Sequence, residues 1–321
     1  MSANETETQN NFEKYSEYYS KSRLKTWVTC PRKFYYKYVE KIDTPETESM
    51  VRGTDIHELI EYYYENIEEY AKDNSEPPTT LFSLLNTEEH DNWREYLDPY
   101  LAHFLAFERR RWDACQNMSD WIPVSVEDEI WTKLYSDRPI LMGFADVLLP
   151  AASINSVATN EGCVLIDFKT GKSNENYMGH EEGGVYLDLA YYAMIFESKY
   201  DIVAVGAYYP LEDKLVTSGI KEEREKFIDD ITSQINNADE DNITDYPIDE
   251  QPLCAWGAGE DERCAFYEEC DSTWAEPIDN ADETVEYIMD GLTNKEIADE
   301  LDTTEQAVNY WVNKKRWHRY R

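Results

Sequence analysis

The stretch Cys163-Val-Leu-Ile-Asp167-Phe-Lys169-Thr-Gly171-Lys172 decides the fold, because an apolar run ends in charged residues and a turn. Side chains alternate between the two faces of a β-strand, so Asp167 and Lys169 project from one face. A carboxylate and an ammonium group at the end of a buried strand are costly unless they bind something. A divalent metal ion with its attacking water is one candidate ligand, and an ordinary ion pair is the alternative.

A second apolar strand with a single acid lies upstream. The segment Leu141-Met-Gly143-Phe-Ala-Asp146-Val-Leu-Leu is apolar apart from Asp146. The two strands together resemble the PD-(D/E)XK nuclease superfamily, and in particular its RecB-like branch. There the first acid lies in a Gly-x-x-Asp strand, and the second acid and the lysine lie in an Asp-x-Lys strand. The resemblance implies that Asp146, Asp167 and Lys169 are catalytic.

The same resemblance implies a metal site. The segment Arg52-Gly53-Thr-Asp-Ile-His57 begins a helix, and its Gly-x-x-x-His is similar to the family's histidine motif. A lone histidine at the edge of a helix is more often structural, so both roles stay open. The family's pattern implies that one or two Mg²⁺ or Mn²⁺ ions, which prefer hard oxygen ligands, are held by His57, Asp146, Asp167 and the backbone carbonyl of Phe168. In this scheme Lys169 orients the attacking water or stabilises the phosphate during phosphodiester hydrolysis.

The order of the expected elements fits the same family. The pattern predicts helices over 22–40, from 54 and over 88–113, strands over 122–135, 140–149 and 163–168, a helix over 185–198, a strand over 202–209 and a helix over 221–237. This is the αβββαβ core of the restriction-endonuclease-like α/β fold, preceded by N-terminal helices. Two acids of the first strand, Glu127 and Glu129, would add charge behind the metal ligands.

The helix after the Asp-x-Lys strand departs from the family's pattern. The family usually carries Gln-x-x-x-Tyr there, whereas this chain has Tyr186-Leu-Asp188-Leu-Ala-Tyr191-Tyr192. Tyr186 or Asp188 takes the approximate place of the glutamine, and Tyr191 or Tyr192 supplies the tyrosine. The missing glutamine puts the DNA-positioning role of this helix in doubt, but not the metal site.

Two basic segments are candidates for nucleic-acid contact. In the first, Arg32 and Lys33 are interleaved with aromatic residues, as in surfaces that track a phosphate backbone and stack bases. The alternative is an amphipathic helix with Phe34, Tyr35 and Tyr38 in the core. The Cys-Pro-Arg-Lys-Phe-Tyr-Tyr sequence itself resembles the RecB-like families, including the CRISPR-associated members. In the second, Arg109-Arg-Arg-Trp112 either complements the end of a helix or faces DNA.

The cysteines indicate a further site. Three of the six lie close together near the C-terminus, which favours a metal or cluster over a disulfide framework in a chain this long. The segment resembles the C-terminal clamp of iron–sulfur RecB-like nucleases, which implies that a four-iron–four-sulfur (4Fe–4S) cluster is ligated by Cys30, Cys254, Cys264 and Cys270. Zinc is the alternative. The nine residues between Cys254 and Cys264 depart from the family, which has two there.

The C-terminal residues 282–321 form a separate module after a polar linker over 271–281. The sequence predicts three short helices with turns at Gly291 and Asp302. Its Gly-Leu-Thr-Asn-Lys-Glu-Ile-Ala segment resembles a LuxR-type helix-turn-helix. The resemblance implies that 304–314 is a recognition helix. The residues that would contact DNA from this helix and the basic tail after it are Gln306, Asn309, Lys314, Lys315 and Arg316. A helical protein-interaction module is the alternative.

The net charge of −37 argues against a nucleic-acid partner at first sight. The acid is spread over the whole chain, however, as on halophilic proteins, where net charge maintains solubility. At about 1 M salt the Debye length is only ~3 Å, so local contacts decide binding. We therefore expect a protein from the high-salt cytoplasm of a halophile or its virus. It would have no membrane span, a loose tail over 1–14, and a nuclease domain over 15–270.

These observations predict a Mg²⁺- or Mn²⁺-dependent DNA nuclease, expected to act as an exonuclease on single strands or duplex ends. The alternatives are a DNA-binding regulator on a catalytically inactive nuclease scaffold and an RNA-processing nuclease. The intact set of Asp146, Asp167 and Lys169 argues against the regulator. Roles in DNA repair, recombination or viral DNA processing fit this activity, and protein partners in recombination or CRISPR adaptation stay unidentified.

Overall fold

The computed structural model of the chain describes residues 18–74, 94–115, 117–133, 140–173, 185–220, 224–250, 254, 263–270 and 281–314. The chain divides into two compact units, which we describe separately. Unit 1 comprises residues 1–28 and 48–237, and unit 2 comprises residues 29–47 and 238–321. The tail expected over 1–14 and residues 271–280 of the expected linker lie outside the described residues. No described helix is both long and apolar enough to cross a membrane.

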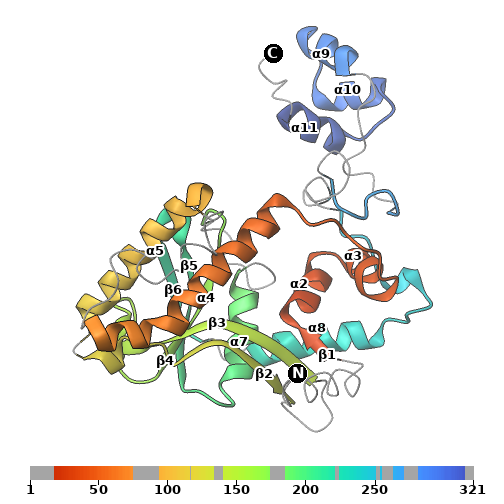
Figure 1. The fold of residues 1–321 in the computed structure, drawn as a ribbon. Helices are drawn as coiled ribbons and strands as arrows, with labels where there is room; N and C mark the ends of the chain where they lie inside the picture. The colour runs from red at the N-terminus through yellow and green to blue at the C-terminus, as the bar shows by residue number, and fades with distance from the viewer. Residues whose placement is uncertain are drawn as a thin grey trace. The chain divides into compact units, whose positions relative to one another are not determined.

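Unit 1 is a mixed sheet covered by helices (Figure 1). Its elements are β1 (Tyr18–Ser20), α2 (Lys21–Thr29, whose last residue belongs to unit 2), α4 (Glu48–Asn74), α5 (Arg94–Ala114), β2 (Ser125–Thr132), β3 (Ile140–Pro150), β4 (Cys163–Phe168), α7 (Val185–Phe196), β5 (Ile202–Tyr209), β6 (Lys214–Ser218) and α8 (Arg224–Asn237), with short 3₁₀ turns at Met118–Asp120, Ala151–Ser153 and Pro210–Glu212. The expected α/β fold class is confirmed, since β2, β3 and β4 form the antiparallel meander and α7 leads to β5. This arrangement is consistent with the restriction-endonuclease-like fold.

The strand β1 was not expected from the sequence, and it determines what meets at the centre of the sheet. It pairs in parallel with 140–142 of β3, whereas β4 pairs antiparallel with 147–150. Since β2 pairs along 141–148 and occupies one edge of β3, β1 and β4 must share the other edge. Both strands therefore end beside the middle of β3, and the residues that follow them, Lys21 and Lys169, emerge into the same gap.

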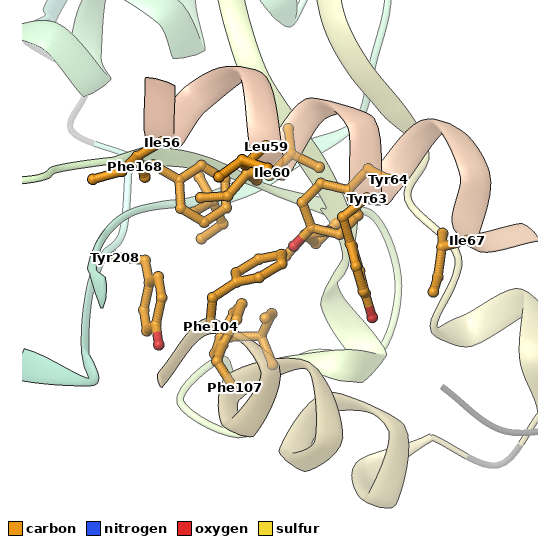
Figure 2. Close-up of a cluster of buried hydrophobic side chains, with 14 of the residues drawn as sticks. Ile56, Leu59, Ile60, Tyr63, Tyr64, Ile67, Phe104, Phe107, Phe168 and Tyr208 are labelled. Atoms are coloured by element: carbon orange, nitrogen blue, oxygen red, sulfur yellow. The ribbon is translucent and has the colours of Figure 1, made fainter. Parts of the chain in front are cut away.

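The main core of unit 1 lies between the sheet and the helices α4 and α5. The helix α4 contributes apolar residues to this core at the spacing of an amphipathic helix. Figure 2 shows α4 side chains pointing toward Phe104 and Phe107 of α5, beside Phe168 of β4 and Tyr208 of β5. Because residues alternate along a strand, Phe168 anchors this core while its neighbours, Asp167 and Lys169, project from the other face.

Unit 2 holds the segment after Cys30 and the C-terminal helices. The helix expected over 22–40 is interrupted at Cys30, and Pro31 occupies the first turn of a second helix, where its missing N–H costs nothing. The elements are α3 (Pro31–Phe34), a π-helical turn (Tyr35–Val39), a 3₁₀ turn (Ile243–Asp245), α9 (Ala281–Met289), α10 (Asn294–Glu300) and α11 (Glu305–Lys314). The rings of Phe34 and Tyr35 pack against Tyr246, which confirms their expected place in a core.

The three C-terminal helices form where the sequence predicts them. Gly291 and Asp302 adopt positive φ at the two turns. Thr293 and Glu296 form a reciprocal capping box at the start of α10. The small core contains Ile288, Ile297, Ala298, Val308 and Val312, with Tyr287, Leu292 and Leu301 packed against it.

Candidate metal centre

The two acids expected to be catalytic are brought together by the register of β3 and β4. Val147 pairs with Ile166, so Asp146 and Asp167 follow as cross-strand neighbours. The backbone N–H of Phe168 donates to Asp146 Oδ2 at 2.7 Å, which orients this carboxylate. The sheet thus holds two carboxylates side by side at the place where β4 ends.

Three side chains converge as candidate metal ligands: His57 of α4, Glu127 of β2 and Asp146 of β3. One donor atom from each lies within 4.8 Å of the others. His57 Nδ1 is 3.5 Å from Asp146 Oδ2, and its Nε2 is 3.0 Å from the carbonyl oxygen of Phe168. One imidazole and several oxygens form a donor set that suits Mn²⁺ or Mg²⁺, so the residues present fit the expected ion.

Glu127 is a stronger candidate here than the sequence indicated. It lies opposite Asp146 in the register of β2 and β3, and its backbone has a φ of +43°. Such a conformation is rare for a non-glycine residue and is found mainly where the surrounding structure enforces it. Glu129, expected beside it, instead accepts a hydrogen bond from Trp131 Nε1 at 2.6 Å.

The electrostatics of these acids show that they are crowded together. Burial, together with nearby Asp146, raises the pKa of Glu127 to about 8. Burial and the neighbouring Asp167 also raise the pKa of Asp146. Carboxylates whose pKa rises in this way are stabilised in their charged form by a bound cation. This part of the site therefore has an excess of negative charge that a divalent ion would relieve.

Asp167 differs, because it faces ammonium groups. Lys169 Nζ lies 2.5 Å from its Oδ2, and Lys21 Nζ lies 3.6 Å from its Oδ1. Burial alone would raise the pKa of Asp167, which is only 2% exposed, but Lys169 and Lys21 lower it to about 2. The expected pairing of Asp167 and Lys169 on one face of the strand is thus present in the structure, with Lys21 added to it.

Asp188 of α7 extends this row of charges. Its Oδ2 accepts hydrogen bonds from Lys25 Nζ at 2.9 Å and Lys169 Nζ at 3.3 Å. Asp188 is 1% exposed, and within the described part of the chain its Oδ1 has no hydrogen-bond partner. Asp188 therefore binds two lysines from the first turn of α7.

The two expected DNA-binding tyrosines of α7 have other tasks. Tyr191 is fully buried; its hydroxyl donates to the carbonyl oxygen of Tyr19 at 2.5 Å and accepts from Met142 N at 3.1 Å. The expectation that Tyr191 contacts DNA is wrong, because its hydroxyl ties β1 to β3. Tyr192 lies under Lys21, whose Nζ is 4.7 Å from the ring centre.

Gly143 of the Gly-x-x-Asp segment packs closely against the same ring. A Cβ at Gly143 would lie 2.9 Å from the Tyr192 ring, so the absence of a side chain at this position allows β3 and α7 to approach each other.

The basic residues expected to contact nucleic acid in unit 2 also serve the fold. Arg32 is buried, and its Nε donates to the carbonyl oxygen of Tyr246 at 2.8 Å. The prediction that Arg32 binds DNA is therefore wrong, because its guanidinium holds the 3₁₀ turn at 243–245. Lys33 is half-buried and lines a pocket of unit 2.

That pocket contains all four cysteines of the expected clamp. It has a volume of about 40 Å³, and its walls include Cys30, Cys254, Cys264, Cys270, Tyr36 and Phe266. The cysteines are free thiols. Among the residues that the structure describes, no three of these sulfurs lie within 4.8 Å of one another. Tetrahedral zinc, with Zn–S of about 2.3 Å, separates its sulfurs by only ~3.8 Å. The cysteines share one pocket without forming a single-ion site.

The C-terminal residues expected to contact DNA are only partly described. Gln306 and Asn309 are exposed on α11, and Asn309 Oδ1 accepts a hydrogen bond from Asn294. Lys314 ends α11, but its side chain lies outside the described residues, as do Lys315 and Arg316.

Sequence reasoning missed the two lysines of α2. The helix Lys-Ser-Arg-Leu-Lys-Thr-Trp-Val-Thr carries three cations and no acid. The whole chain has 67 acidic and 30 basic residues. An acid-free helix with three cations is unusual in so acidic a chain, and this contrast could have identified α2 as part of a functional site. The contacts of Lys21 and Lys25 depend on β1, which the sequence pattern did not predict.

The comparison with protein families agrees with this geometry. Residues 18–271 match the model of a family described as the PD-(D/E)XK nuclease superfamily. No curated protein matches the chain. The matched range includes both acidic strands, His57, both lysines of α2 and the four cysteines.

Proposed function

The chain belongs to the PD-(D/E)XK nuclease superfamily, and we propose on this basis that it is a metal-dependent deoxyribonuclease. One observation carries the proposal: His57, Glu127 and Asp146 present donor atoms within 4.8 Å of one another, beside the Asp167–Lys169 pair. A structural ion pair would be enough to explain the contact between Asp167 and Lys169. It does not explain why an imidazole and two further carboxylates converge on the same strand ends.

The residues of the site fall into metal ligands and groups that act on the water or the phosphate. His57, Glu127, Asp146 and the carbonyl of Phe168 would hold a divalent ion, and Asp167 would join them when its ammonium partners move to the substrate. A bound Mg²⁺ or Mn²⁺ ion supplies charge neutralisation at the phosphate and lowers the pKa of a water molecule. Lys169 orients the attacking water or donates to the phosphate, and Asp188 holds the Lys169 side chain in place.

The choice of DNA as substrate rests on the C-terminal helices. Their order and turns resemble a LuxR-type helix-turn-helix, with Gln306 and Asn309 exposed on the helix that would enter a groove. The basic residue Lys314 ends this helix, and Lys315 and Arg316 follow it in the sequence of an otherwise acidic chain, as phosphate contact requires. The RecB-like pattern of Gly143 to Asp146 and Asp167 to Lys169 favours action at DNA ends.

Cleavage of labelled nucleic acids tests this proposal. The full chain is incubated in molar KCl with Mn²⁺ and end-labelled single-stranded DNA, duplex DNA or RNA, and matched samples contain a chelator. We expect metal-dependent shortening of DNA from an end. Shortening of RNA alone would identify an RNA-processing enzyme. DNA binding without cleavage of any substrate would instead favour the DNA-binding regulator on an inactive scaffold.

The cysteine pocket supports a second proposal, that unit 2 carries a 4Fe–4S cluster on Cys30, Cys254, Cys264 and Cys270. Four thiolates are the ligand set of such a cluster. Zinc is the alternative, because four thiolates can also hold a single Zn²⁺ ion.

Anaerobic reconstitution with iron and sulfide tests the cluster. We expect about four irons and four sulfides per chain and a visible absorption band, both lost in Cys264→Ser. Cys163→Ser is the matched control, because Cys163 is buried in β4 of unit 1. Zinc bound with higher stoichiometry than iron would contradict the proposal.

The charge of −37 supports a working environment of molar salt, which we propose is the cytoplasm of a halophile or its virus. Mutual repulsion among 67 acidic residues is screened there. The unfolding temperature should therefore rise steadily between 0.1 M and 3 M KCl. A chain that precipitates or unfolds in molar KCl would contradict this proposal.

A further inference from the structure

The face of the site that carries Asp167 holds more cations than its acids need. Asp167 is already in contact with Lys169 at 2.5 Å, and Lys21 approaches its other oxygen at 3.6 Å. Lys25 adds a third ammonium through Asp188. Bringing a second ammonium to a paired carboxylate costs desolvation and repulsion from the first, so it is unfavourable unless an anion also binds.

The sheet directs Lys21 to this position. It is the first residue after β1, and Lys169 is the first after β4, so both leave strands that end on the same edge of β3. The Tyr191 hydroxyl fixes β1 there, and the Tyr192 ring supports the Lys21 side chain. The Lys21 side chain is 21% exposed, so it is supported by the protein on one side and stays partly open to solvent on the other.

We propose that Lys21 is a substrate-binding residue that contacts a backbone phosphate at the scissile position or next to it. This inference rests on the proposed nuclease function and names a residue for it. In the free protein Lys21 is held by Asp167. When Asp167 serves a bound metal ion, Lys21 is left among like charges, and a phosphate oxygen becomes its best partner. Lys25, four residues further along the same face of α2, is then placed to reach along the substrate.

The proposal predicts opposite effects on two ligands. Lys21→Met keeps most of the aliphatic stem on Tyr192 and removes only the charge. Nucleic-acid binding should weaken, because one phosphate contact is lost. Mn²⁺ binding without nucleic acid should stay the same or tighten, because a cation beside Asp167 is gone. If Lys21 only held α2 on the sheet, its replacement would not weaken nucleic-acid binding while leaving Mn²⁺ binding unchanged or tighter.

The test measures both ligands on the full chain. Binding of labelled single-stranded DNA is followed by fluorescence anisotropy at several KCl concentrations, with Ca²⁺ in place of Mn²⁺ so that the metal site is occupied, and gel analysis checks that the DNA stays intact. For Lys21→Met we expect affinity to fall by about tenfold or more, and the slope of log K against log salt to decrease by about one. Lys21→Arg should retain binding. Lys72→Met, which removes an exposed lysine paired with Glu68 on α4, should change neither quantity.

Three outcomes would overturn the inference. In the first, Lys21→Met binds DNA like the wild type. In the second, it loses DNA and Mn²⁺ binding together, which indicates a collapsed site. In the third, its unfolding temperature falls while DNA affinity of the folded protein is unchanged, which indicates a structural role. If Lys21→Met does not fold, Lys21→Gln is measured in the same way. A wild type that binds DNA but never cleaves it removes the nuclease function and leaves the binding role of Lys21 measurable.

Discussion

The Glu108–Arg111 pair of α5 and the charges around Asp167 both lie in unit 1, yet only the first group is complete. Arg111 Nη1 donates to Glu108 at 2.8 Å, its Nε to Ser153 Oγ at 3.1 Å and its Nη2 to the carbonyl of Trp121 at 2.6 Å. Tyr64 donates to Glu108 at 2.7 Å. Every donor group is used inside the protein, so no ligand is needed to explain the pair.

The group around Asp167 is built from the same kinds of residue but is not balanced. Three lysines meet two aspartates on one side, while Glu127 and Asp146 crowd together on the other with raised pKa values. One oxygen of Asp188 has no hydrogen-bond partner among the described residues. The contrast teaches that a buried charge with every partner satisfied supports the fold, whereas separated excesses of both signs indicate a site for a metal ion and a phosphate.

The largest expected effect is on catalysis, from Lys169→Met. The change removes the ammonium expected to act on the water or the phosphate, so the cleavage rate should fall by about 10²–10³-fold. The unfolding temperature should change little, since Lys21 still contacts Asp167 and Lys25 still contacts Asp188. Single-turnover cleavage and thermal unfolding measure the two effects. Loss of stability in proportion to loss of activity would place Lys169 with the structural group.

Arg111→Met should produce the reverse pattern. It leaves the Glu108 carboxylate buried without its cation, which costs about 3–5 kcal/mol of unfolding free energy. Denaturant unfolding measures this loss, and the folded fraction should cleave at the wild-type rate. Arg109→Met is the matched control, because its pair with Asp113 is exposed and contributes only ~0–1 kcal/mol. An inactive but fully folded Arg111→Met protein would break the distinction between the two groups.

Asp213→Asn should have the smallest effect. Burial tends to raise the pKa of Asp213, but hydrogen bonds from Arg110 and Tyr208 lower it below its ordinary value of 3.8. Its contribution is therefore present above pH 3.8 and lost as the pH falls through the lowered pKa. At neutral pH the variant should lose up to about 1 kcal/mol, less in molar salt, and asparagine tolerates the positive φ at this position.

Stability curves of wild type and Asp213→Asn should converge at acidic pH. A difference that stays constant down to pH 2 would mean that the pair stabilises the turn through shape and not through charge.

The sequence predicted those features that depend on short spacings. Alternation along the strand placed Asp167 and Lys169 on one face, and the Gly143–Asp146 spacing identified the neighbouring strand. The turns at Gly291 and Asp302 were predicted as well, and both residues adopt positive φ. Each of these depends on interactions within a few residues, which a single sequence contains.

Features that depend on long-range pairing were not predictable in the same way. The three-residue strand β1 is too short to show a periodicity, yet its pairing with β3 delivers Lys21 to the site. The tasks of Tyr191 and Arg32 depend on partners 172 and 214 residues away in the chain. The basic run at 109–111 could not be interpreted without knowing that Glu108 lies beneath Arg111 and Asp213 lies beside Arg110.

The measurement that tests the central claim most directly is Mn²⁺-dependent DNA cleavage by Asp146→Asn beside the wild type, with both proteins shown to be folded in molar KCl. Asp146 joins His57 and Glu127 in the candidate metal centre, and its Oδ2 lies 3.5 Å from His57 Nδ1. The account predicts a fall in rate on the order of a thousandfold or more, because several kcal/mol of charge stabilisation depend on the ion. Cleavage by Asp146→Asn at the wild-type rate would contradict it and remove the metal centre from the proposed mechanism.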